Sequence, residues 1–111
     1  MLTFEEIQKH VFDGLNSPPR PLRVILFGSY ARGAPLGESD IDLVVVLDKE
    51  GKSDSYRALV SNRVEISRRL RQLKRKQSVD ILVYTKEEWA TLRASNSSFI
   101  QRIEAEGLDI L

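Results

Sequence analysis

The sequence contains no cysteine among its 111 residues. Disulfide bonds and thiolate metal sites are therefore excluded, and a reducing compartment is compatible with the chain. An excess of charge of one sign is also missing, because 17 basic and 16 acidic residues leave a net charge of +1. A chain this close to neutral lacks the positive potential of a general nucleic-acid binder, so we predict no direct binding to nucleic acid.

Long hydrophobic runs are absent as well. The longest apolar run covers residues 43–47, far short of the roughly 20 residues that cross a bilayer. The first residues have neither the basic start nor the apolar core of a signal peptide. We therefore expect a cytoplasmic protein that does not contact membranes, folded as a single domain over residues 1–111.

Helical and strand-like periodicities alternate along the chain. Apolar, β-rich runs predict strands at 22–27, 40–47 and 79–84, with a further edge strand at 108–111. Capping residues and spacing predict helices at about 3–13, 30–32 and 55–75, and two more that begin after Thr85 and after Asn96 or Ser97. On the helix over 55–75, the apolar spacing predicts a buried stripe of Tyr56, Leu59, Val60, Ile66, Leu70 and Leu73. The short crossing between the first two strands predicts that they are antiparallel, and the long helix returns the chain so that the third runs parallel to the second. The fold class is therefore α/β of the α+β type, with a mixed sheet of three to four strands and flanking helices.

Two aspartates, Asp40 and Asp42, interrupt the otherwise apolar second strand. Residues two apart on a strand point to the same face, so these carboxylates project together, roughly 7 Å apart. Asp80 interrupts the third strand in the same way, and the parallel arrangement brings it to the same edge. Each aspartate alone is typical of a turn or a cap, but three in apolar strands require a neutralising charge. Mg²⁺ takes few carboxylates together with waters and phosphates, so the pattern predicts one or two Mg²⁺ ions.

The turn after the first strand is the second candidate element. Gly28 permits a tight turn and a close approach of phosphate, and Ser29 adds a hydroxyl at the start of a short helix. Arg32 follows one turn later, where it either reaches a phosphate or is simply solvated. Gly33 is interpreted as a helix stop, with loop at 34–37.

The series Gly28-Ser29, Gly33 and Ser39-Asp40-Ile41-Asp42-Leu43, with Asp80 on a later strand, resembles the signature of the nucleotidyltransferase superfamily that includes DNA polymerase beta. The chain looks like a minimal nucleotidyltransferase with no appended domain. The resemblance implies Mg²⁺ at Asp40, Asp42 and Asp80, and ATP at Gly28 and Ser29, with Arg32 within reach of phosphate. It also implies transfer of a nucleoside monophosphate with loss of pyrophosphate.

Small members of this superfamily commonly act as antitoxins. The resemblance therefore implies a partner, a helical HEPN ribonuclease toxin, in a hetero-oligomer, with AMP attached to a tyrosine of that toxin. One alternative is an antitoxin that neutralises its toxin by binding alone, against which the three carboxylates argue. Another is a small-molecule transferase, such as one that modifies aminoglycosides, against which the missing acceptor domain argues.

Residues 68–76 carry six basic side chains in nine positions. The favoured interpretation is a solvated face with favourable charge at the end of a helix. The predicted topology leaves other roles open, because this helix end returns to the edge that holds the carboxylates. The basic side chains there would contact triphosphate, an acidic partner, or RNA held by a toxin.

Overall fold

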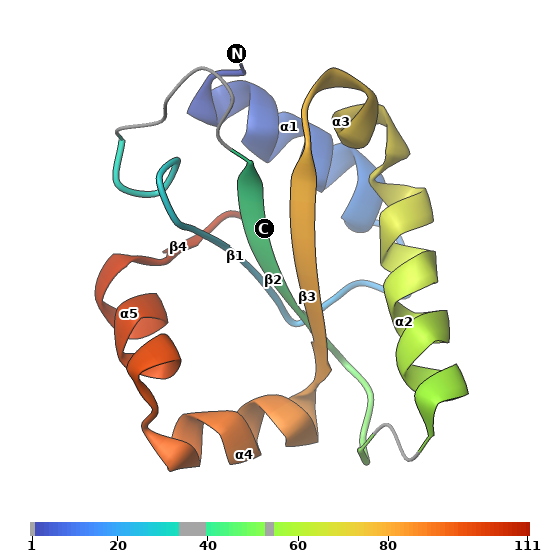
Figure 1. Cartoon of the computed structure of the whole chain (residues 1–111). Helices are drawn as coiled ribbons and strands as arrows, with labels where there is room; N and C mark the ends of the chain where they lie inside the picture. The colour runs from blue at the N-terminus through green and yellow to red at the C-terminus, as the bar shows by residue number, and fades with distance from the viewer. Residues whose placement is uncertain (1, 34–39, 53–54) are drawn as a thin grey trace.

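The computed structural model describes residues 2–33, 40–52 and 55–111. Four strands form one mixed sheet in the order β3-β2-β1-β4 (Figure 1). They are β1 (Arg23–Phe27), β2 (Ile41–Leu47), β3 (Val79–Thr85) and β4 (Leu108–Asp109). β1 pairs with β2 and β4 in antiparallel fashion, and β2 pairs with β3 in parallel. The predicted fold class and strand directions are therefore confirmed.

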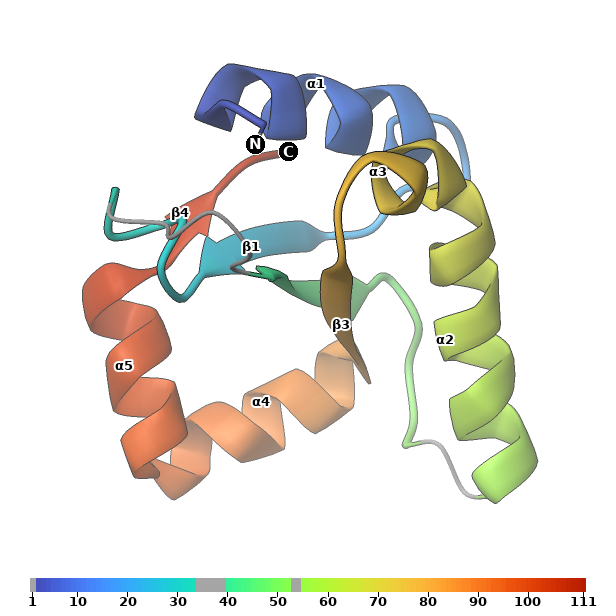
Figure 2. The same ribbon diagram turned by 45° about the horizontal axis from the view of Figure 1, so that its top comes forward.

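Helices cover both faces of the sheet (Figure 2). α1 (Phe4–Leu15), α2 (Tyr56–Arg69) and α3 (Arg71–Lys76) pack on one face, and α4 (Lys86–Ser95) and α5 (Ser98–Glu106) pack on the other. None of the helices that the structure describes has both the length and the hydropathy of a membrane span.

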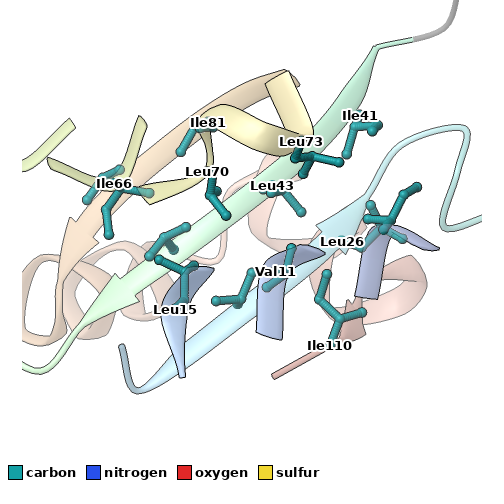
Figure 3. Close-up of a cluster of buried hydrophobic side chains, with 14 of the residues drawn as sticks. Val11, Leu15, Leu26, Ile41, Leu43, Ile66, Leu70, Leu73, Ile81 and Ile110 are labelled. Carbon is teal, nitrogen blue, oxygen red and sulfur yellow. The ribbon is translucent and has the colours of Figure 1, made fainter. Parts of the chain in front are cut away.

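The strand β2 contributes to two separate hydrophobic clusters. Leu43 and Val45 belong to the larger cluster under α1, α2 and α3, which is drawn in Figure 3. Val44 and Val46 point the other way and pack with Trp89 of α4. Because both faces of β2 are buried, its sequence is a nearly continuous apolar run.

Capping side chains fix where the helices begin. Thr3 and Glu6 form a capping box at α1, as the sequence predicts, and Thr85 forms another with Glu88 at α4. Ser97 rather than Asn96 caps α5. Asn96 instead ends α4 in the left-handed region, at φ +48°, which asparagine tolerates better than most residues.

The predicted helix over 55–75 is wrong in two respects. It breaks at Leu70 into α2 and α3, because this buried residue has φ −104° and ψ +16°, outside the helical range. Tyr56 and Leu59, predicted to be buried, are exposed, whereas Ile66 and Leu73 are buried as expected. The reason is that the first part of α2 projects away from the sheet (Figures 1 and 2).

Some predictions fall on positions that the structure leaves undescribed. The loop predicted at 34–37 and Ser39 of the motif lie outside the described residues, as do positions 53–54.

Candidate nucleotidyltransferase site

The end of β1 and the starts of β2 and β3 meet at one edge of the sheet. Phe27 pairs with Asp42, and Asp42 pairs with Asp80. Neighbouring strands are about 4.8 Å apart, and directly paired residues project to the same face. Asp42 and Asp80 therefore lie side by side, on the face that α4 and α5 cover farther along the strands.

Asp40 lies just before β2 and is exposed to solvent. Within the described ranges, no three carboxylate, imidazole or thiol side chains are gathered as a set of metal ligands in this conformation. Three like charges repel one another, which favours carboxylates that stand apart. The side chains of Asp40, Asp42 and Asp80 would therefore have to rotate to enclose one cation. The assignment of Asp40, Asp42 and Asp80 to a metal stays a prediction.

The electrostatic environment of Asp42 suits a cation. Burial raises the pKa of Asp42 above its ordinary value, and the negative charges of Asp80 and Asp40 raise it further. Arg32 acts in the opposite direction and is the weakest of these influences. The carboxylates therefore interact with one another, and their protein neighbours compensate only part of their charge. Carboxylate oxygens are also the donors that Mg²⁺ and Ca²⁺ prefer, so these residues fit a hard cation.

Gly28 leaves the space that the Asp42 carboxylate occupies. Its φ is +76°, in the region that favours glycine. A Cβ built at this position would lie 2.3 Å from Oδ2 of Asp42, closer than real Cβ contacts. The glycine is thus needed both for the turn and for the close approach of the carboxylate. The sequence predicted the turn, but this contact depends on strand register and was missed.

The short helix predicted at 30–32 is a hydrogen-bonded turn. The amide of Arg32 donates to the carbonyl of Gly28 at 3.2 Å, and Gly33 donates to Tyr30 at 3.2 Å. Gly33 then leaves the helical region with φ +72°, so the turn does not propagate. Ser29 therefore lies in a turn rather than at a helix N-terminus, and the helix-dipole argument for phosphate binding does not apply to it.

Tyr30 connects this turn to the approach to β3. Its ring is 7% exposed and packs in the larger hydrophobic cluster. Its hydroxyl accepts a hydrogen bond from the side-chain amide of Gln77, two residues before β3 begins. The segments that carry Gly28 and Asp80 are thereby fixed relative to each other. Only this tertiary contact reveals the positioning role of Tyr30.

Arg32 lies beside the site but is paired elsewhere. Its Nη1 lies 3.3 Å from Oε2 of Glu106 at the end of α5, and both side chains are partly exposed. The guanidinium is near enough to Asp42 to affect its pKa. The structure thus shows an ion pair where the sequence left open a phosphate contact or a solvated residue.

The basic helix end returns to the same edge, as the predicted topology requires. Lys74 of α3 lines a groove of about 290 Å³ together with Asp80 and part of α2. This groove lies on the β3 side of the site, whereas Gly28 lies on the β1 side.

The nucleotidyltransferase domain family matches residues 9–107. The chain belongs to this family. No curated protein matches the chain.

Solved structures with the same fold include toxin–antitoxin complexes. One, a toxin–antitoxin with AMP-PNP, superposes with a TM-score of 0.58 at 24% identity and covers 99% of this chain and 73% of that chain. The MntA–HpeT toxin–antitoxin, in a variant with two aspartates exchanged for glutamate, gives 0.57 at 22% identity, with the same coverage. The same complex with one tyrosine exchanged for alanine gives 0.55 at 22% identity and covers 100% of this chain and 73% of that chain. At these identities the likeness shows the nucleotidyltransferase fold.

Proposed function

We propose that this nucleotidyltransferase domain transfers AMP from ATP to a hydroxyl group of a partner toxin, and so acts as its antitoxin. The observation that carries the proposal is the register that sets Asp42 and Asp80 side by side, with Gly28 against Asp42. Membership of the nucleotidyltransferase family favours a reaction of a nucleoside triphosphate. The mutual repulsion of Asp40, Asp42 and Asp80 favours a reaction that depends on a bound cation.

Each residue has a distinct role in this proposal. Asp40 and Asp42, with Asp80, would hold one or two Mg²⁺ ions, which when bound supply charge neutralisation for the triphosphate. The backbone at Gly28 and the hydroxyl of Ser29 would hold phosphate oxygens, with Arg32 as a further donor. Asp80 would accept the proton of the acceptor hydroxyl.

The reaction breaks a phosphoanhydride bond of ATP and forms a phosphoester bond to the acceptor. The acceptor oxygen forms a bond to the α-phosphorus of ATP, and the bond from that phosphorus to pyrophosphate breaks. Positioning and electrostatic stabilisation supply most of the acceleration in such transfers.

The toxin partner is inferred from the structural neighbours. Three of the solved structures with this fold are toxin–antitoxin complexes, and one of them contains AMP-PNP, an ATP analogue. We take the partner to be a helical HEPN ribonuclease in a hetero-oligomer and the acceptor to be one of its tyrosines. A chain without cysteine is compatible with the reducing cytoplasm, where we place this activity.

The test is mass spectrometry of the chain purified with its co-expressed partner, before and after addition of ATP and Mg²⁺. We expect the partner to gain one or more AMP units, and Asp42→Asn to abolish the gain. Asp48→Asn is the matched control, because Asp48 is exposed just beyond the opposite end of β2 and should leave transfer unchanged. Transfer at the wild-type rate by Asp42→Asn would refute the assignment.

A second candidate is an antitoxin that acts by binding alone. It is favoured by one observation, that the described carboxylates are not gathered as metal ligands in this conformation. In the same experiment it predicts a stable complex with no change of mass in either protein.

A further inference from the structure

We infer that the groove beside Asp80 is the docking site for an acidic segment of the acceptor protein. The inference rests on the proposed function, because it assigns the acceptor side of the same site. The groove has a volume of about 290 Å³, and its lining includes Val60, Arg63, Val64, Ser67, Lys74 and Asp80.

A second hollow extends the groove along the helices. Its volume is about 590 Å³, and it shares Val64, Ser67 and Lys74 with the first. It adds the basic side chains Arg68, Arg71 and Arg75. Together the two hollows, which we call the Asp80 groove, lead from the catalytic edge along the outer surface of α2 and α3.

The strand order separates this groove from the nucleotide. Gly28 follows β1, and Asp80 lies on the edge strand β3. Asp42 lies on β2, which separates β1 from β3 in the sheet. A triphosphate held at Gly28 would lie on the β1 side of Asp42. An acceptor that approaches from the β3 side does not pass the nucleotide, and the Asp80 groove opens on that side.

The positive charge of the groove comes from Arg63, Arg68, Arg71, Lys74 and Arg75. Within the described part of the chain, no carboxylate forms an ion pair with Arg63, Arg68, Arg71 or Arg75. Lys74 donates a hydrogen bond to Ser67. The basic side chains are thus concentrated on one surface and form no ion pair with the described carboxylates, although the whole chain has a net charge of only +1. Such a surface attracts an anionic partner and orients its approach.

The apolar part of the lining favours a polypeptide over RNA. Val64 is 59% exposed, and Val60 and Val79 line the groove beside the cations. Among the described residues that line the two hollows, none is aromatic, so unstacked bases would find no ring to pack on. Aliphatic side chains between cations instead suit a segment in which acidic and hydrophobic residues alternate. The volume at Asp80 is near the lower limit for small-molecule sites.

The test measures binding without nucleotide. The probe is a fluorescein-labelled random copolymer of glutamate and tyrosine, followed by fluorescence anisotropy, with a lysine–tyrosine copolymer and oligouridine RNA as comparisons. We expect the wild type to bind the glutamate copolymer most tightly, and more weakly as salt is added.

Charge reversal locates the binding surface. Arg68→Glu with Arg71→Glu should weaken binding of the glutamate copolymer by roughly tenfold or more, and Arg68→Gln with Arg71→Gln should weaken it less but in the same direction. Arg20→Glu with Arg102→Glu is the matched control, because both residues are exposed and lie outside the groove. This pair changes the net charge of the chain by the same amount as Arg68→Glu with Arg71→Glu. Binding by the control pair should stay within about twofold of wild type.

Three results would overturn the inference. They are equal loss of binding in the control pair, no loss in either groove pair, and tighter binding of oligouridine or of the lysine copolymer than of the glutamate copolymer. Because no ATP is present, a failure of AMP transfer leaves these outcomes unaffected, so the docking site and the proposed function can fail separately.

Discussion

Replacing Gly28 with alanine tests the contact on which the site is built. The backbone there has φ +76°, and an L-residue in this region costs about 1–2 kcal/mol. The new Cβ would also lie 2.3 Å from Oδ2 of Asp42, so that carboxylate must leave its position. Moving a side chain off its preferred rotamer costs about 0.5–1.5 kcal/mol. We therefore expect Gly28→Ala to lower the free energy of unfolding by about 1.5–3.5 kcal/mol.

Gly51 provides the matched control. Its φ is +78°, and within the described structure a Cβ there meets no heavy atom within 4 Å. Gly51→Ala should therefore show only the backbone cost of about 1–2 kcal/mol. Both variants are measured by urea denaturation, and AMP transfer is measured alongside. The displaced carboxylate predicts that Gly28→Ala loses transfer, whereas Gly51→Ala retains it. Equal destabilisation of the two variants with retained transfer in both would refute the close approach of Asp42 to Gly28.

Three further variants test the site and a contact that holds the connection between α1 and β1. Asp42→Asn should raise the free energy of unfolding at neutral pH without divalent cations, because the raised pKa of Asp42 means that the folded state holds this proton more tightly than the unfolded state. The wild type loses stability as pH rises from the ordinary value of 3.8 through that raised pKa, and urea titrations across pH should show that the variant lacks this loss. Arg69→Lys should cost about 1–3 kcal/mol in the same denaturation assay, because Arg69 donates to three carbonyl oxygens of segment 14–19. Glu106→Gln should raise the KM for ATP by roughly twofold to fivefold, because it removes the ion pair with Arg32. The free energy of unfolding should change by less than about 1 kcal/mol. An unchanged KM would show that Arg32 is not part of the phosphate site.

The sheet was predictable because its signals are local and strong. The β2 run from Leu43 to Leu47 is too apolar for any position except the centre of the sheet. Helix starts at Thr3 and Thr85 follow from capping boxes that three-residue spacing reveals. Strand directions followed from connection lengths, which predicted Asp80 at the same sheet edge as Asp40, and the register confirms that Asp80 lies at this edge beside Asp42.

The errors concern features that tertiary packing decides. The apolar spacing of Tyr56 and Leu59 is typical of a helix, but spacing does not show whether a sheet lies under that part of the helix. Here no sheet covers these two side chains, and both are exposed. The break at Leu70 contains no glycine or proline, so no helix-breaking residue marks it. Similarly, the pairing of Arg32 with Glu106 and of Tyr30 with Gln77 joins residues 74 and 47 positions apart. Such pairs depend on how the helices and strands pack, and the periodicity of the sequence does not reveal that packing.

The central claim is that carboxylates from two strands hold one cation with a nucleotide. The most direct measurement is electron paramagnetic resonance of Mn²⁺, used in place of Mg²⁺, titrated with the protein and AMP-PNP. The account predicts that the wild type and Asp48→Asn bind Mn²⁺ equally, whereas Asp42→Asn and Asp80→Asn each lose most of this binding. Wild-type binding of Mn²⁺ by Asp80→Asn would contradict it, because the cation would then be held without the residue that β3 contributes.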